Sequence, residues 1–327
     1  MNVLVLGGTG MYGRKTVLKL LQDKDVSKVV SMDISPPKEW FMKQIEKEKD
    51  RFHFIRGDVS QLEDITNAIK LFSVDKLVNW AFLLPGEAEL NPLTSTKINA
   101  LGMCNSFEAA RITGISRVVY ASSSGVYGAQ DEYGDRDVTE DDKLHPGSGY
   151  ALMKQYSEIL ADQYARLYGM NLTALRPVIG CGHEGWPKGP PPIRWFSEIV
   201  SFPAQGKPFT IDMDGTNKAS LAPADDVAEI TRLLLHMDSS PHPAYIVGGP
   251  TTTLQDIAIS VRKYIPEATI EFGNQAPPVT PGRGVVTRVS MDRAREDLGF
   301  SMLSLDEAVL IHINDARLEI GLEPIKA

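Results

Sequence analysis

A tyrosine and a lysine lie four residues apart in this sequence, at Tyr150 and Lys154. On a helix this spacing puts both side chains on one face, one turn apart. A lysine ammonium near a phenol favours the phenolate, so we expect the pKa of Tyr150 to fall towards neutral pH and the phenol to transfer protons. The same spacing also occurs as an ordinary contact on an amphipathic helix. Two features favour chemistry: the serine cluster Ser122-Ser123-Ser124 upstream and a glycine-rich loop near the start of the chain.

The glycine-rich loop contains Gly7, Gly10 and Gly13, and it follows the apolar run from Asn2 to Leu6. A helical pattern of apolar residues begins directly after it. In such a strand–loop–helix setting, Gly7 permits a tight turn, Gly10 lets the backbone approach a pyrophosphate and Gly13 lets the helix pack closely on the strand. The N–H groups at the start of the helix then meet the phosphate charge. The alternative is a plain turn between strand and helix without a ligand.

An acidic residue ends the second apolar run, which extends from Lys28 to Met32 and is followed by Asp33. Asp33 comes about 20 residues after the last loop glycine, where a carboxylate can hold the adenosine ribose hydroxyls. A carboxylate there repels a 2′-phosphate, and no arginine follows in Ile34-Ser35. The sequence therefore favours NAD over NADP. The alternative is that Asp33 only caps the next turn.

Short apolar runs alternate with helical patterns through the first half of the chain. The expected strands are residues 2–6, 28–32, 52–56, 76–81, 117–121 and 172–175. This alternation predicts an α/β fold, a Rossmann-type doubly wound parallel sheet with helices on both faces. Ligands bind at the carboxyl ends of the strands in such sheets. The residues at predicted strand ends, which one crevice could collect, are Gly7, Asp33, Asp58, Ala81, Ser123 and Pro177.

The pattern changes after Pro177. We expect residues 1–178 to form an NAD-binding domain and residues 179–327 a smaller C-terminal α/β substrate-binding region, with 222–248 returning to the first domain. The stretch from Gly180 to Pro192 is rich in glycine and proline and is expected to be an irregular loop bordering a pocket. Further helices are expected at 193–204, 225–236, 254–264, 291–298 and 305–320, and short strands at 209–211 and 245–247.

Composition excludes several classes of function. The net charge of −8 over 327 residues argues against nucleic acid as a partner, because binding phosphates needs a basic surface. No apolar run approaches the roughly 20 residues of a membrane helix, so no membrane partner is expected. The first residues read as a strand, not a signal peptide. Two cysteines, Cys104 and Cys181, imply no disulfide framework, which fits a cytoplasmic location. The six histidines lack metal-ligand spacing, so no metal is expected.

These motifs together resemble the extended short-chain dehydrogenase/reductases, the NAD-dependent epimerase/dehydratase family. The resemblance covers nearly the whole chain. It rests on Gly7-x-x-Gly10-x-x-Gly13, Asp33, Gly57-Asp58-Val59, Ala81, Asn99, the run from Ser122 to Gly128, Tyr150-x-x-x-Lys154, Arg176-Pro177 and Asp225-Asp226-Val227-Ala228.

The resemblance implies that Tyr150 exchanges a proton with a substrate hydroxyl while hydride passes between the same carbon and the nicotinamide. Lys154 would lower the pKa of Tyr150 and bind the nicotinamide ribose, and Ser123 would hold the substrate oxygen. The cofactor-binding residues that it implies are Gly7, Gly10, Met11, Tyr12, Gly13, Asp33, Asp58, Val59, Trp80, Ala81, Phe82, Asn99, Ser122, Tyr150, Lys154, Pro177 and Val178. The candidates on the substrate side are Ser124, Trp186 and Arg194. Ser124 is also the alternative to Ser123.

The sequence departs from the family pattern at one position. Members that act on nucleotide sugars usually carry an arginine six residues before the Asp225-Asp226 pair, where it binds the diphosphate, and here that position is Ala219. Lys218 is adjacent but would face the other way on a strand. This departure favours hydride transfer at a secondary alcohol or ketone of a small polyol, sugar or hydroxy-carbonyl compound.

Two other functions remain open. One is a nucleotide-sugar epimerase, dehydratase or decarboxylase that retains its NAD. The other is a non-catalytic dinucleotide sensor, which the presence of Ser123, Tyr150 and Lys154 disfavours, since sensors of this fold commonly lose such residues.

The family also implies a homodimer, in which the helix after Asn99 and the Tyr150 helix pack against the partner. Both stretches here carry apolar residues on more than one face, and a helix of that kind needs a second surface to bury. These residues are Leu101, Met103, Phe107, Leu152, Ile159 and Leu160.

Overall fold

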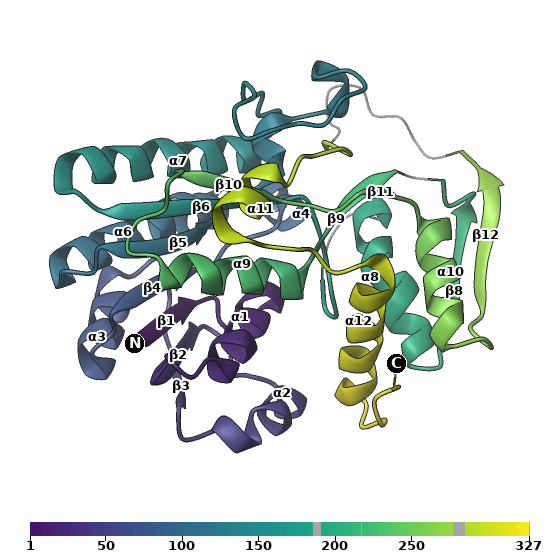
Figure 1. Cartoon of the computed structure of the whole chain (residues 1–327), viewed down its shortest axis with the longest axis horizontal. Helices are drawn as coiled ribbons and strands as arrows, with labels where there is room; N and C mark the ends of the chain where they lie inside the picture. The colour runs from purple at the N-terminus through teal and green to yellow at the C-terminus, as the bar shows by residue number, and fades with distance from the viewer. Residues whose placement is uncertain (186–190, 217, 277–284, 327) are drawn as a thin grey trace.

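The structure is a computed structural model that describes residues 1–185, 191–216, 218–276 and 285–326. Its centre is a sheet of parallel strands in the order β10-β6-β5-β4-β1-β2-β3 (Figure 1). The strands are β1 Asn2–Leu6, β2 Lys28–Asp33, β3 Phe52–Arg56, β4 Lys76–Asn79, β5 Arg117–Ala121, β6 Asn171–Pro177 and β10 Ala244–Val247. The order runs outward in both directions from β1 and β4, which is the doubly wound Rossmann arrangement. The predicted fold class is confirmed.

Helices cover both faces of this sheet. On one face lie α1 (Met11–Gln22) and α9 (Ala224–His236), and on the other α3 (Leu62–Phe72), α6 (Gly102–Thr113) and α7 (Gly149–Tyr168), as Figure 1 shows. Strand β1 explains why two layers are needed, since successive side chains of a strand point to opposite faces. Its valines belong to the core under α1 and its leucines to the core under α3, and all of them are fully buried.

The remaining elements build a smaller C-terminal part with its own core. Strands β11 (Thr251–Thr252), β9 (Ala219–Pro223) and β7 (Ile179–Cys181) form one sheet, and β12 (Ile270–Gln275) pairs with β8 (Phe209–Met213). Helices α8 (Pro191–Ala204), α10 (Leu254–Tyr264) and α12 (Leu305–Glu319) pack around them. Shorter helices are α2 (Glu39–Gln44), α4 (Pro85–Leu90), α5 (Pro92–Ser95) and α11 (Asp292–Leu298). The division of the chain at residue 178 stays a prediction.

Several expected boundaries are wrong. The stretch from Gly180 to Pro192 is not irregular throughout, because β7 pairs with β9 and α8 begins at Pro191, a position where proline is tolerated in a helix. The helix expected from Asn99 begins earlier, since α5 and a π-helical segment, Thr96–Leu101, run directly into α6. Strand β4 ends at Asn79, because the Asn79 side chain accepts a hydrogen bond from the backbone of Ala81.

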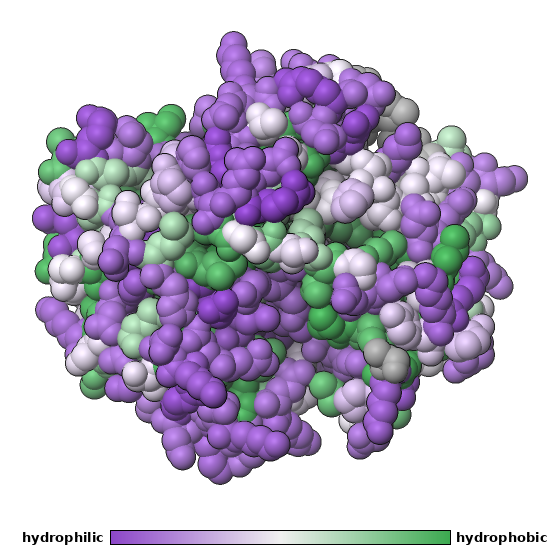
Figure 2. Space-filling model, viewed as in Figure 1, coloured by the Kyte–Doolittle hydropathy of each residue, from purple (hydrophilic) through white to green (hydrophobic). Residues whose placement is uncertain are grey.

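The two parts of the molecule are joined by buried charges. Lys15 of α1 lies 2.6 Å from Asp315 of α12 and 3.1 Å from Asp225 at the start of α9. Figure 2 shows the same face as Figure 1: hydrophilic side chains cover most of it, and hydrophobic ones gather near its middle. Among the described residues, no helix has both the length and the apolar character needed to cross a membrane.

The glycine-rich loop is packed so tightly that two of its glycines, Gly7 and Gly13, have no room for a side chain. Gly7 has a φ of +69°, and a Cβ there would lie 2.6 Å from the backbone nitrogen of Ala81. A Cβ at Gly13 would lie 2.0 Å from the carbonyl oxygen of Gly7. The loop therefore packs backbone against backbone, on itself at Gly13 and on the segment after β4 at Gly7.

We predict that Gly13→Ala destabilises the protein by about 1 to 3 kcal/mol, because the new methyl group must displace backbone. Gly149→Ala is the matched control: Gly149 lies in the first turn of α7, and a Cβ there meets nothing within 4 Å. It should be neutral or stabilising by up to about 1 kcal/mol. Urea unfolding of both variants measures the difference, and equal stabilities would contradict the packing described here.

Candidate active site

Tyr150 and Lys154 lie in the first turns of α7, whose N-terminus is capped by the side chain of Ser148. Both are buried, Lys154 completely. The Lys154 Nζ donates a hydrogen bond to the carbonyl oxygen of Ala121, 2.8 Å away at the end of β5, and it lies 4.0 Å from the centre of the Phe82 ring. The helix therefore presents the phenol and the amine together at the carboxyl end of the sheet.

Ser123 meets this pair from the loop after β5. Its hydroxyl accepts a hydrogen bond from the backbone nitrogen of Gly125 at 3.0 Å, and a further hydrogen bond links it to the Tyr150 side chain. Its neighbour Ser124 is buried in the short 3₁₀ helix Ser124–Tyr127. The structure thus brings together the serine, the tyrosine and the lysine that the sequence singled out.

The pKa of Tyr150 differs from the expectation based on the sequence. Burial raises this pKa above its ordinary value, and only the hydrogen bond with Ser123 opposes the shift. The expected fall is therefore wrong for the free protein. The reason is that the Lys154 amine donates to the Ala121 carbonyl, while the phenol is withdrawn from water.

Lys154 shows the converse effect. Burial lowers the pKa of Lys154 to about 7, and the carboxylate of Glu158 opposes the fall. The amine is consequently near the midpoint of its titration at neutral pH, so its charge responds to any group placed beside it.

A buried ion pair supports these residues from behind. Arg176 of β6 donates to both carboxylate oxygens of Glu158, at 2.9 and 2.6 Å, and to the hydroxyl of Tyr127 at 2.5 Å. The Ser122 hydroxyl also donates to Glu158. Ser122 was expected to bind the cofactor, and here its side chain is engaged in this network. The role of Glu158 was missed, although its position four residues after Lys154 places it on the same face of the helix.

The start of α1 suits a pyrophosphate. Its first turn contains no acidic residue, and no side chain caps it. A Cβ at Gly10 would meet only the carbonyl oxygen of Gly7, at 3.5 Å, so the backbone here is open to a close approach. The free N–H groups and the helix dipole attract an anion. The backbone of Gly10, Met11, Tyr12 and Gly13 therefore fits the diphosphate of NAD.

Residues for the adenosine end are held in place by backbone contacts. The carboxylate of Asp33 accepts hydrogen bonds from the backbone of Thr9 at 3.1 Å and of Ser35 at 3.3 Å. Asp33 therefore caps the next turn, as the alternative reading of the sequence expected. Contacts with a ribose remain possible, because each carboxylate oxygen accepts more than one hydrogen bond. Asp58 caps its own turn through Ser60, at 2.8 Å, beside the buried Val59.

The middle of the cofactor path is organised by Asn99. Its amide exchanges hydrogen bonds with the backbone of Leu83, at 2.7 and 3.1 Å, and so fixes the segment that carries Ala81 and Phe82. The Trp80 indole donates to Thr16 of α1 at 3.0 Å. Asn99 and Trp80 thus act within the protein, and a direct contact of either with the cofactor stays a prediction.

Positions on the substrate side are spread over several elements. Pro177 and Val178 are buried next to β10. Arg194 lies in α8, where it pairs with Glu198 at 3.3 Å. Trp186 lies outside the described residues. Ala219, which replaces the family arginine, is fully buried at the start of β9, and the adjacent Lys218 is exposed.

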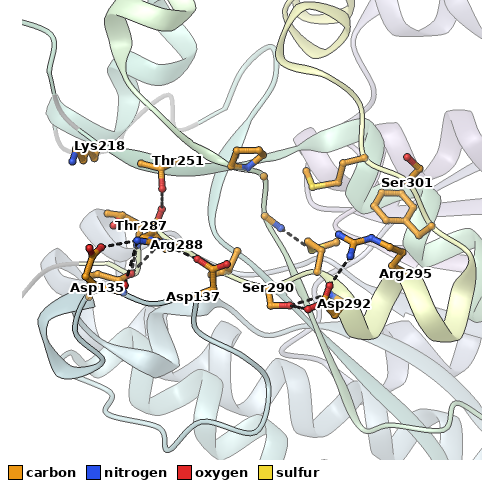
Figure 3. A pocket seen from close by; sticks show the side chains of 18 residues that line it. Asp135, Asp137, Lys218, Thr251, Thr287, Arg288, Ser290, Asp292, Arg295 and Ser301 are labelled. Atoms are coloured by element: carbon orange, nitrogen blue, oxygen red, sulfur yellow. Dashed lines mark hydrogen bonds and ion pairs between the residues drawn. The ribbon is translucent and has the colours of Figure 1, made fainter.

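A cavity of about 830 Å³ lies between the acidic loop after β5, the turn after β10 and the segment before α11 (Figure 3). Most of its charges are paired with one another: Arg288 contacts Asp135 at 2.6 Å and Asp137 at 3.0 Å, and Arg295 contacts Asp292 at 2.5 Å. Ser123, Tyr150 and Lys154 do not line it. We therefore do not place the reaction there.

Two groups of described residues bring histidine and carboxylate atoms close enough for a metal ion: Asp23, Asp25 and His236, and His183, Glu184 and Glu319. In the second group, Arg14 lies 2.8 Å from Glu184 and Lys38 lies 3.2 Å from Glu319, so cations of the protein already neutralise both carboxylates. The expectation that no metal is bound stays untested.

Comparison with known proteins identifies the class. The model of the NAD-dependent epimerase/dehydratase family matches residues 3–248. The chain therefore belongs to this family, an extended short-chain dehydrogenase/reductase family of NAD-dependent epimerases and dehydrogenases. The expected family and NAD as the cofactor are confirmed.

The individual relatives share a third or less of their aligned residues with this chain. An uncharacterised protein of Methanocaldococcus jannaschii is 33% identical over 57% of this chain and 58% of its own length. The UDP-glucose 4-epimerase of Mycolicibacterium smegmatis is 28% identical over 70% of this chain and 71% of its own. The chain also matches about two fifths of three trifunctional enzymes of Arabidopsis thaliana, covering 41–42% of their length.

Solved structures share the fold over almost the whole chain. The UDP-glucose 4-epimerase of Thermus thermophilus, in complex with NAD, has a TM-score of 0.79 at 24% identity and covers 97% of this chain and 99% of its own. A threonine dehydrogenase of Cupriavidus necator also has a TM-score of 0.79, at 19% identity, and covers 96% and 99%. At this level of identity these matches show the fold alone.

The lowered pKa of Lys154 predicts how stability depends on pH. Between the folded value of about 7 and the ordinary value of 10.5, the unfolded chain binds a proton that the folded chain has lost. Rising pH therefore favours the folded state. Without cofactor, the wild type should gain about 2 kcal/mol relative to Lys154→Met between pH 7 and 9.

Thermal or urea unfolding across this pH range tests the expectation. Lys97→Met, at an exposed lysine, should show the same pH dependence as the wild type. Parallel curves for the wild type and Lys154→Met would contradict the burial effect.

Proposed function

We propose that this protein is an oxidoreductase that transfers hydride between NAD and a secondary alcohol or ketone of a small polyol, sugar or hydroxy-carbonyl compound. The observation that carries the proposal is the hydrogen bond between Tyr150 and Ser123 at the carboxyl end of the sheet, with the Lys154 Nζ 5.5 Å from the centre of the Tyr150 ring. Three groups that can hold an oxygen and move its proton meet there, beside a loop that fits a dinucleotide.

In this mechanism Tyr150 exchanges the proton. Since burial keeps the phenol neutral at physiological pH, the free protein is ready to donate a proton to a carbonyl oxygen. In the oxidative direction the phenolate accepts the alcohol proton, and a charged Lys154 stabilises it. Ser123 holds the substrate oxygen by a hydrogen bond. NAD, when bound, supplies the hydride acceptor, and NADH the donor.

A small substrate is favoured over a nucleotide sugar by Ala219, which offers no charge where relatives bind a diphosphate. The threonine dehydrogenases that share this fold are named for a small hydroxy amino acid. The second candidate is a nucleotide-sugar epimerase, dehydratase or decarboxylase that keeps its NAD, which the similarity to the M. smegmatis epimerase supports. The presence of Ser123, Tyr150 and Lys154 disfavours the dinucleotide sensor.

A substrate screen followed at the absorbance band of NADH tests the proposal. Release of one NADH for each oxidised secondary alcohol is the expected result. Conversion of a sugar nucleotide without release of NADH would replace the proposal with the second candidate.

The role of Tyr150 predicts the effect of Tyr150→Phe. This change removes only the hydroxyl, so the fold and NAD binding should persist while turnover falls by a factor on the order of 10² to 10⁴. Tyr156→Phe, at an exposed tyrosine of the same helix, should leave turnover unchanged. Near-normal turnover of Tyr150→Phe would remove Tyr150 from the mechanism.

We also propose a homodimer through α6 and α7. Of the apolar residues that suggested it, Met103, Phe107 and Leu160 are buried within the chain, whereas Leu101, Leu152 and Ile159 are 45%, 55% and 62% exposed. Exposed apolar groups of this kind on adjacent helices are typical of an interface.

Light scattering at micromolar concentration should therefore give the mass of a dimer. Ile159→Lys should shift the mass towards the monomer, because it would bury an unpaired charge. Ile259→Lys, at an equally exposed position of α10, should not. A monomeric wild type would end this proposal.

We also propose a cytoplasmic location, which the low cysteine content supports.

A further inference from the structure

The hydroxyl of Tyr12 has no hydrogen-bond partner among the described residues, although it is buried. Tyr12 is the second residue of α1, in the turn that directly follows the glycine-rich loop. Its side chain is 8% exposed, and its ring lies 5.2 Å from the Trp80 ring, centre to centre. A buried polar group without a partner is costly and uncommon, so this hydroxyl requires an explanation.

The hydroxyl points across the carboxyl end of the sheet. A Cβ built on Gly180 of β7 would lie 2.4 Å from the Tyr12 hydroxyl oxygen. Gly180 follows Val178, the residue expected at the nicotinamide end of the site. Burial raises the pKa of Tyr12, and the charges of Cys181 and Tyr150 raise it further, so the hydroxyl lies near the proton-transfer group as well. The Tyr12 side chain therefore reaches from the diphosphate loop towards the reacting end of the cofactor.

None of the side chains near this hydroxyl forms a hydrogen bond with it among the described residues, although the polar groups of Cys181 and Tyr150 lie close enough to influence its pKa. Met11 and the Trp80 ring form its walls, and the Trp80 indole nitrogen donates to Thr16. A bound molecule can supply the missing partner. A nicotinamide ring has one hydrogen-bonding substituent, a carboxamide, which offers both an acceptor oxygen and a donor nitrogen. A phenol hydroxyl can donate to the one and accept from the other.

We propose that the Tyr12 hydroxyl hydrogen-bonds the carboxamide of the nicotinamide and thereby fixes which face of the ring meets the substrate. This assignment rests on the proposed function in one respect, because it takes the nicotinamide to lie beside Tyr150. It also explains the glycine at position 180, since any side chain there would displace the hydroxyl.

Tyr12→Phe tests the assignment by binding alone. ADP-ribose contains the adenosine, the diphosphate and the second ribose of NAD but lacks the nicotinamide. In calorimetric titrations, Tyr12→Phe should bind NAD⁺ about tenfold more weakly than the wild type, as expected for one lost hydrogen bond. It should bind ADP-ribose with unchanged affinity. Because the unpartnered hydroxyl is gone, the free variant should melt at the same temperature as the wild type or higher, and NAD⁺ should raise its melting temperature less.

Tyr245→Phe is the matched control. The Tyr245 hydroxyl is also buried, but it donates to Asp297 at 2.7 Å, away from the glycine loop. This variant should lose stability and keep both affinities. Unchanged NAD⁺ affinity in Tyr12→Phe would overturn the assignment, and so would an equal loss of NAD⁺ and ADP-ribose affinity, which would place the effect in the loop. Wild-type protein that binds NAD⁺ but oxidises nothing would count against the proposed function and leave this result intact.

Discussion

The position of Tyr150 and Lys154, the proposed proton-transfer groups, depends on one buried ion pair, between Arg176 of β6 and Glu158 of α7. Its two parallel hydrogen bonds fix the rotation of α7 against the sheet, and Tyr150 and Lys154 lie on the same helix. Burying two charges is offset only where geometry is good and the remaining polar atoms are satisfied. Here Ser122 adds a donor to the carboxylate. We infer that this pair contributes a defined geometry more than net stability.

The same pair influences the charge of the site. Lys154 is fully buried, and burial alone would push its pKa lower still; the Glu158 carboxylate counteracts this. The Ala121 carbonyl and the Phe82 ring face give the ammonium two further favourable contacts. Since Arg176 in turn neutralises Glu158, a series of alternating charges runs from the sheet to Tyr150. The charge of Lys154 thus depends on Glu158, and the charge of Glu158 is held by Arg176.

The sequence was sufficient to predict the features that depend on residue spacing along the chain. Alternation of apolar runs with helical patterns identified the central sheet, and the spacing of Tyr150 and Lys154 identified the pair that α7 presents. The pKa of Tyr150 could not be predicted, because it depends on how deeply the fold buries the phenol and on which carbonyl receives the Lys154 amine. Strands β7, β9, β11 and β12 were missed. Strand β7 has only three residues, one of them Gly180, and β11 only two, so no alternating pattern marks them. Glu158 left a usable signal, four residues after Lys154.

The N-termini of the helices differ in whether a side chain caps them, and this difference indicates where a ligand can bind. Helices α10 and α12 begin with complete capping boxes, formed by Thr253 with Asp256 and by Ser304 with Glu307. The N-cap residue of helix α1 is Gly10, which has no side chain to cap the helix. Its unsatisfied N–H groups lower the stability of the free protein and are available to the cofactor diphosphate. A ligand that accepts hydrogen bonds from these N–H groups binds only the folded state. Cofactor binding should therefore raise the stability of the fold and offset the loss caused by the missing cap.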